Sequence, residues 1–374
     1  MRIPRSRFRA SGATIARSIV IVLAAAAVGV AIIDDGGSTS GPDPLRLQFV
    51  YSPDTKELLA PLVARFNRDA LKVRGQRIRI EDRSITSGEA ERMIAAGTFK
   101  PVVWAPASSL WGRLLNADVR KEWVPLDNPS IVQSPQVIAI PETTARELGW
   151  PRRAISWKDI PRLAARREFR FDHPNPTTST SGLSAIAAEY YAVTGKLAGL
   201  TIDDVNAARG EFRQIEQSVV EYAPTADDLL EQLRRHGPRY ASAVVVQETS
   251  LVQFNAHSRW RLVAAYPADG TFVADYPFIV LDSPWTASTE RAAAHIFWNW
   301  LRSQVTPQAA ARHGYRVPTP GAPVLPPIDP EHGADPSKPD VVLRPPAPDV
   351  LSAILASWRE DRNRATDDHE SSSG

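Results

Sequence analysis

A strand-like segment that ends in a serine and runs directly into a helix-like segment recurs along this chain. Residues 45–51 (LRLQFVY) alternate as a strand does, and Ser52-Pro53 supplies a capping residue and a first helical residue. A second strand-like segment covers residues 77–81, and Ser87-Gly88 precedes a helix-like segment over residues 89–96. Strands that alternate with helices predict a mostly parallel α/β sheet, which binds ligands at the carboxyl ends of its strands.

The rest of the chain continues this pattern up to a proline-rich tail. We expect further strands at residues 102–106, 134–140, 169–172, 242–246, 261–266 and, as one longer strand, 272–281. We expect further helices at residues 142–148, 157–166, 182–193, 226–235, 291–301 and 307–313. Residues 317–349 hold eleven of the 32 prolines and predict an extended segment. An amphipathic segment at 350–358 precedes a polar end, from Arg364 on, that predicts disorder.

The N-terminus places the folded part of the protein outside the cytoplasm. Five arginines and no acidic residue fall within residues 1–33, and the run from Ser18 to Ile33 is uncharged. Basic residues before an apolar run keep the N-terminus in the cytoplasm and send the following chain outward. We expect residues 1–33 to be an uncleaved signal anchor, a single transmembrane helix, with a cleaved signal peptide and secretion as the alternative. Residues 34–44 predict a linker.

Composition excludes several classes of function. The chain has a net charge of +2, but without the five N-terminal arginines it has 39 basic and 42 acidic residues, so no nucleic-acid partner is expected. The absence of cysteine excludes disulfides and thiolate metal sites. The seven histidines show no metal-binding spacing, and we expect neither a metal nor a cofactor.

Three predicted helix starts carry the candidate binding residues. They are Ser52, Ser87-Gly88 and the end of a run of five hydroxyl residues, Thr177 to Ser181, which Gly182 follows. A helix start presents unpaired backbone N–H groups and the positive end of the helix dipole, so three of them aimed at one cleft would hold an oxyanion. Ordinary helix capping is the alternative explanation, and the sequence leaves both open.

A catalytic explanation of the hydroxyl run is disfavoured. Ser179 or Ser181 could act as a nucleophile with His173 as the base, but the run lacks the Gly-x-Ser-x-Gly turn. The acids best placed to face a cleft are Glu248, just after a predicted strand, and Asp275. The protein is therefore not expected to be an enzyme.

The ordered set of these segments resembles the bacterial extracellular solute-binding proteins related to molybdate-binding periplasmic proteins. More narrowly, it is similar to the branch in which this module precedes a von Willebrand factor A domain. The segments that carry the resemblance are VYSPDTKELLAPLVARFN, ITSGEAERMIAAGTFKPVVWAPASSLW, SPQVIAIP, HPNPTTSTSGLSAI, YPADGTFVADYPFIVLDSPW and AAAHIFWNWLRS with ARHGYRVP.

The resemblance implies a two-lobed type II periplasmic-binding-protein fold with two crossover strands. Lobe one would comprise residues 45–133 plus 276–318, lobe two residues 134–275, and residues 319–374 a proline-rich C-terminal extension. The ligand would lie between the lobes, where pockets commonly form. The resemblance assigns ligand contacts to Ser52, Ser87, Gly88, Ser179, Thr180, Ser181, Gly182, Glu248 and Tyr266.

Two functions remain open on the sequence. The first is a membrane-anchored solute-binding protein that closes its lobes on a small polar ligand, such as an oxyanion, with or without a transporter permease as partner. The second is an envelope scaffold with a vestigial cleft that works with a separately encoded von Willebrand factor A protein. The C-terminal segment GADPSKPDVVLRPPAPDVLSAILASW is similar to the connector that leads into that domain in the fused relatives, but the domain itself is absent from this sequence.

Overall fold

The computed structural model describes residues 43–372, apart from residues 126, 167 and 168 and the side chains of residues 365–372. The expected anchor at residues 1–33 lies outside the described residues, as does the expected linker at 34–44 except for its last two residues. Within the described part, none of the helices has both the length and the apolar character needed to cross a bilayer.

The first of two sheets has parallel strands at its centre. Its order is β10-β4-β1-β3-β2, and β1 runs parallel to β3 and β4, whereas the edge strands β2 and β10 are antiparallel to their neighbours. The strands are β1 (Leu45–Tyr51), β2 (Lys72–Val73), β3 (Gln76–Ser84), β4 (Val103–Ala105) and β10 (Ile279–Val280).

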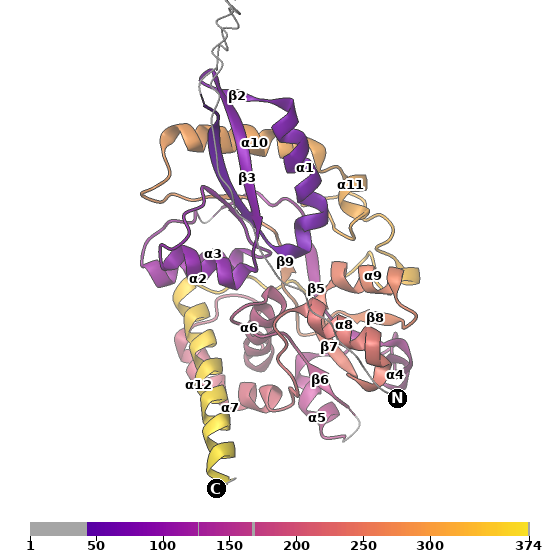
Figure 1. Ribbon diagram of the computed structural model, residues 1–374. Coiled ribbons are helices and arrows are strands. Elements are labelled where there is room, and N and C mark those ends of the chain that lie inside the picture. Colours follow the sequence, from indigo (N-terminus) through magenta and orange to yellow (C-terminus); the bar gives the residue numbers. More distant parts are fainter. Residues whose placement is uncertain (1–42, 126, 167–168, 373–374) are drawn as a thin grey trace, which may run out of the picture. The chain divides into compact units, whose positions relative to one another are not determined.

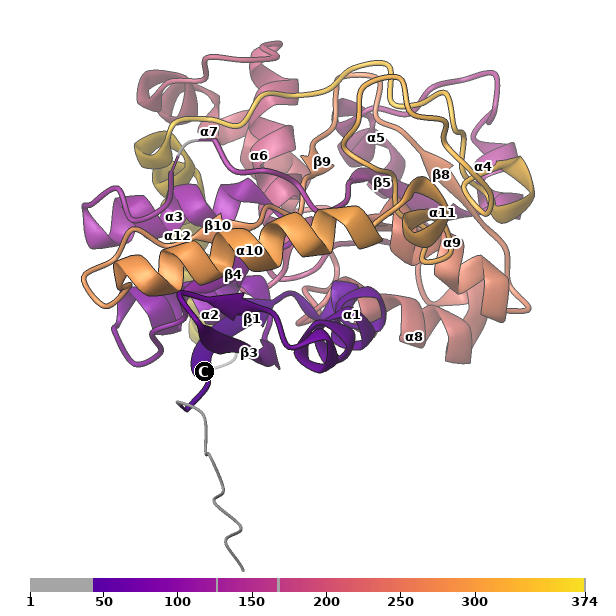
Figure 2. The same ribbon diagram turned by 90° about the horizontal axis from the view of Figure 1, so that it is seen from above.

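Helices cover both faces of this sheet because β1 is apolar on both. Leu47, Phe49 and Tyr51 share one core with Phe66 and Phe297, whereas Val50 belongs to the core on the other face. The first face is covered by α1 (Lys56–Asp69) and α10 (Ser288–Gln304), which lies across the strands in Figure 2. The second is covered by α2 (Ser87–Ala95) and α3 (Ser109–Val119); the sequence had not indicated α3.

The second sheet corrects the expectation of mostly parallel strands. Its order is β6-β7-β5-β8, and β5 runs antiparallel to both of its neighbours. The strands are β5 (Ser134–Pro141), β6 (Phe171–Asp172), β7 (Ala243–Gln247) and β8 (Leu262–Ala265). Because β5 arrives from the first sheet and not through a helical crossover from a neighbour, nothing requires it to run parallel to β7 or β8.

Helices also cover both faces of the second sheet. On one face lie α8 (Ala226–His236) and α9 (Glu248–His257), and on the other α6 (Thr180–Thr194) and α7 (Ile202–Glu216). Neither α7 nor α9 was indicated by the sequence. Shorter helices are η1 (Pro53–Thr55), α4 (Glu142–Glu147), η2 (Trp157–Asp159), α5 (Ile160–Ala164), η3 (Gly237–Arg239) and α11 (Pro307–Ala311).

The segment expected as one strand over residues 272–281 forms two short strands. β9 (Val273–Ala274) pairs with β5, whereas β10 pairs with β4 in the first sheet. Between them Tyr276 has a left-handed backbone, with φ at 38°, which ends the first strand. The chain thus passes from one sheet to the other within a few residues.

The C-terminal tail is partly helical, in contrast to the predicted disorder of its end. Apart from η4 (Pro330–His332), residues 317–347 form no helix, as the prolines predict. Helix α12 (Pro348–Ser372) then runs well beyond the expected segment and packs on α3, α6 and α7 (Figure 1). Its buried apolar residues are Val350, Leu351, Ile354, Leu355 and Trp358, a helical stripe, and they share one core with residues from both sheets.

Candidate functional site

A cavity of about 150 Å³ lies where the first turns of helices η1, α2, α6, α8 and α9 meet. Three of these starts carry the predicted binding residues, and those of α8 and α9 are additional. The lining residues are Ser52, Pro53, Asp54, Thr86, Ser87, Thr178, Ser179, Thr180, Thr225, Ala226, Asp227, Gln247 and Ser250.

Several backbone N–H groups at these helix starts remain available as donors. The N–H groups of Ser87, Thr180, Ala226 and Asp227 donate to no other described residue, as expected of first helical turns. The positive ends of the helix dipoles add to their attraction for acceptor atoms. The cavity therefore offers hydrogen-bond donors to a ligand without any lysine or arginine among its described lining residues.

Ser52, Ser87 and Ser179 line this cavity, but they do not cap the helices through their side chains. The Ser52 hydroxyl donates to the carboxylate of Asp54, and no side-chain cap is formed at Ser52 or Ser179. The Ser87 hydroxyl accepts a hydrogen bond from the N–H of Ala107 over 3.0 Å. Its own proton is donated to no described residue. The hydroxyl of Thr180 accepts the indole N–H of Trp111 over 2.8 Å.

Gly88, Ser181 and Gly182 surround the cavity without being among its lining residues. A Cβ on Gly88 would lie 2.2 Å from the carbonyl oxygen of Thr177, and one on Gly182 would lie 2.1 Å from that of Pro174. Both glycines therefore allow close packing within the protein, and their assignment as ligand contacts stays a prediction. The Ser181 hydroxyl donates to Gln247 Oε1 over 2.9 Å and so orients a side chain that does line the cavity.

Two carboxylates, Asp54 and Asp227, also line the cavity and were not singled out from the sequence. Asp54 accepts hydrogen bonds from Ser52 and from the hydroxyl of Tyr276, the latter over 2.7 Å. Asp227 is an exposed residue that lines the cavity, and it makes no hydrogen bond or ion pair with another described residue. Desolvation by the neighbouring protein atoms, followed by the charge of Asp54, raises the pKa of Asp227 to about 6.

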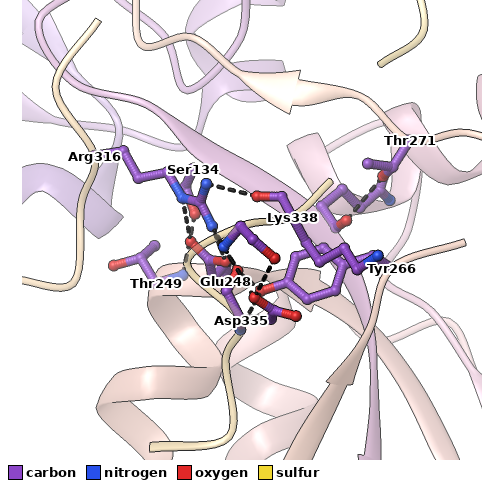
Figure 3. A network of polar contacts seen from close by, with 10 residues as sticks. Ser134, Glu248, Thr249, Tyr266, Thr271, Arg316, Asp335 and Lys338 are labelled. Atoms are coloured by element: carbon purple, nitrogen blue, oxygen red, sulfur yellow. Dashed lines mark hydrogen bonds and ion pairs between the residues drawn. The ribbon is translucent and has the colours of Figure 1, made fainter. Parts of the chain in front are cut away.

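Glu248 and Tyr266, which the resemblance placed at the ligand, lie elsewhere (Figure 3). Glu248 is fully buried, and its two carboxylate oxygens accept Arg316 Nε over 2.8 Å and Nη2 over 2.6 Å. The Tyr266 hydroxyl donates to Glu248 as well. Neither residue lines the cavity at the helix starts, and their assignment as ligand contacts stays a prediction.

The same network attaches the proline-rich tail to the second sheet. Arg316 Nη1 donates to the carbonyl oxygen of Lys338 over 2.6 Å, and the N–H of Asp335 donates to the Tyr266 hydroxyl over 3.1 Å. Burial raises the pKa of Glu248, and Arg316 opposes this effect. Since Arg316 also exchanges backbone hydrogen bonds with Gln133, directly before β5, the network joins the tail to a connection between the sheets.

Two α/β units whose helix starts converge on a polar cavity define a two-lobed solute-binding fold of the periplasmic-binding-protein type. Residues 47–316 match the family described as bacterial extracellular solute-binding protein, and the chain belongs to that family. A search of the curated proteins gives no match.

Solved structures with the same fold include proteins with different ligands. A periplasmic thiamin binding protein has a TM-score of 0.60 at 11% identity, with 86% of this chain and 98% of that chain covered. A fructose-6-phosphate-bound periplasmic binding protein from Actinobacillus pleuropneumoniae has a TM-score of 0.52 at 10% identity, with 87% of this chain and 98% of that chain covered. A Trichodesmium protein in complex with iron and citrate has a TM-score of 0.54 at 12% identity, with 86% of this chain and 99% of that chain covered. These likenesses extend to the fold and do not name a ligand for this chain.

Proposed function

We propose that this protein captures a small polar solute outside the cytoplasm, in the cavity formed by the five helix starts. The observation that carries the proposal is the combination of unpaired N–H donors with two carboxylates around one cavity of about 150 Å³. A cavity of this volume holds a molecule about the size of benzene. The ligand is thus a small molecule and not a peptide or a large cofactor.

The charge of the cavity narrows the class of ligand. Asp54 and Asp227 would repel a simple oxyanion, and no described lining residue is a lysine or arginine that could offset them. Unpaired N–H groups need acceptor atoms in the ligand, whereas the carboxylates need donors. A zwitterionic or polyhydroxylated ligand satisfies both, so we favour it over the oxyanion suggested by the sequence.

The boundaries of the lobes and the attachment to the membrane belong to the same proposal. We assign residues 45–133 plus 276–318 to lobe one and residues 134–275 to lobe two, with closure on the ligand as the mechanism. The basic and apolar N-terminal run supports a single-pass membrane anchor. A transporter permease would then be the partner that receives the solute.

Thermal-shift screening of the purified full-length chain tests the proposal. Small amino acids, polyols and sugars should include a compound that raises the melting temperature, whereas molybdate, tungstate and sulfate should not. Asp227→Asn should abolish the shift. The matched control is Asp203→Asn, because Asp203 occupies the same position after Thr201 in α7 as Asp227 after Thr225 in α8.

Three outcomes would contradict this assignment. A shift with molybdate alone would restore the oxyanion as ligand. A shift that survives Asp227→Asn would place the ligand elsewhere. If no compound shifts the melting temperature, the scaffold function with a von Willebrand factor A partner becomes the better explanation.

A further inference from the structure

Three buried ionisable side chains from separate elements meet in the second lobe. His173 lies between β6 and α6, Glu189 lies on α6, and Glu216 ends α7. One nitrogen or oxygen atom from each lies within 4.8 Å of those of the other two. The side chains of His173 and Glu189 are fully buried, and Glu216 is 8% exposed.

The contacts of the His173 ring require a proton or a cation between His173 Nε2 and Glu216 Oε1. His173 Nδ1 lies 2.8 Å from the carbonyl oxygen of Pro174, which can only accept, so Nδ1 carries a proton. In the neutral ring Nε2 is then an acceptor, yet it lies 2.9 Å from Glu216 Oε1. Two acceptors at this distance need a proton or a metal ion to hold them together.

Glu189 is a second carboxylate of the cluster that lacks a compensating positive charge. Both of its carboxylate oxygens are buried and accept no hydrogen bond from the described residues. With the imidazole neutral and both carboxyl groups ionised, the cluster would carry a charge of −2, which either two protons or one divalent cation would balance.

We propose that His173 Nε2, Glu189 and Glu216 bind a divalent transition-metal ion of the zinc type as a structural site. An imidazole nitrogen and carboxylate oxygens are ordinary zinc ligands. With metal–ligand bonds of about 2.1 Å, two tetrahedral ligands lie about 3.4 Å apart, so small side-chain shifts suffice to close the site.

The surrounding contacts have the form that supports a metal ligand. The Pro174 carbonyl fixes the ring of His173 with Nε2 facing the carboxylates, and the Tyr222 hydroxyl donates to Glu216 Oε2 over 2.8 Å. The ion would tie α6 to α7 and to the segment after β6. Since the first turn of α6 lines the solute cavity, the ion would stabilise one wall of the cavity.

Metal analysis of the purified full-length chain tests this site. Protein produced with Zn²⁺ in the medium should contain about one zinc ion per chain after dialysis, and removal by a chelator should lower its melting temperature. Glu189→Gln should lose the ion and melt as the chelator-treated protein does. Glu211→Gln changes an exposed residue on α7 and should retain the ion.

The same variant separates the metal from the two protons. A glutamine mimics a protonated Glu189, so with protons alone Glu189→Gln would keep the melting temperature of the unchanged protein. The proposal is overturned if the zinc-supplied chain contains no stoichiometric metal, or if Glu189→Gln retains it.

Discussion

The backbone N–H of Gly88 donates to the carbonyl oxygen of Thr178 over 3.3 Å, so the first turn of α2 rests on the segment that leads into α6. Arg92 adds a hydrogen bond of 2.6 Å to the carbonyl oxygen of Thr177. The bond from Trp111 to Thr180 is the third contact between these regions. Helix α12 packs on both α3 and α6. Opening of the proposed lobes would therefore break specific hydrogen bonds and separate buried apolar surface.

Gly88→Ala should destabilise this contact, because the new Cβ would meet the Thr177 carbonyl oxygen at 2.2 Å and the ring of Trp111 at 2.7 Å. Overpacking of this kind costs about 1–3 kcal/mol, measurable by denaturant unfolding. Gly210→Ala is the matched control, since a Cβ at that position in α7 meets nothing within 4 Å. It should gain up to about 1 kcal/mol from helix propensity. An unchanged unfolding midpoint for Gly88→Ala would show that α2 does not rest on Thr177 and Thr178 in solution.

Glu91 on α2 should make the protein less stable as the pH rises. Burial, followed by the charge of Asp118, raises its pKa from 4.5 to about 7, whereas Arg92 and Arg359 oppose the shift. Between these values the folded protein binds more protons than the unfolded chain, so the free energy of unfolding falls across this window. The loss is complete above pH 7 and amounts to roughly 3 kcal/mol.

Urea unfolding of Glu91→Gln at a series of pH values measures this effect. The variant should match the unchanged protein well below pH 4.5, where Glu91 is protonated in both states, and be more stable at pH 8. Glu89→Gln alters an exposed residue on the same helix and should leave the pH profile unchanged. A gain of the same size at both pH values would show that burial of the charge is not its cause.

Arg316→Met should be strongly destabilising, because it leaves the fully buried Glu248 without its partner cation. Removal of one member of a buried ion pair costs about 3–5 kcal/mol. Thermal or denaturant unfolding should show the loss, and the double variant with Glu248→Gln should recover part of it. Arg302→Met, at an exposed position on α10, is the control. A loss confined to that control would contradict the role of the network.

Local patterns predicted most of the elements and four of the five helix starts at the cavity, three of them as candidate binding sites. Strand β1 and the start of α6 follow from apolar alternation and from hydroxyl-rich caps, which act within a few residues. The antiparallel placement of β5 could not be predicted, because strand pairing depends on contacts far apart in the sequence. The split of residues 272–281 at Tyr276 did have a local signal, because Pro277 lacks the N–H that a continuous strand needs.

The charged residues that the sequence analysis missed or misplaced have partners that lie far away in the sequence. Asp227 follows a capping threonine, as many helix-start acids do, and only the fold brings it to Asp54. Glu248 appeared to face a cleft because it follows a strand, but Arg316 reaches it from a distant segment. His173 and Glu216 likewise have no short spacing that would indicate a pair. Sequence patterns therefore predicted where the cavity lies, but not which charged residues line it.

The pH dependence of ligand binding should report the charge of Asp227. With a pKa of about 6, its carboxylate is ionised at pH 7.5 and mostly protonated at pH 5. A ligand that donates a hydrogen bond or presents an ammonium group to this carboxylate loses that attraction on protonation, so its affinity should fall as the pH decreases through 6. Titration calorimetry of the full-length chain with a hit from the screen, at pH 5 and at pH 7.5, measures the change. Asp203→Asn should keep this dependence, whereas tighter binding at pH 5 would mean that the ligand is an anion that the carboxylate repels.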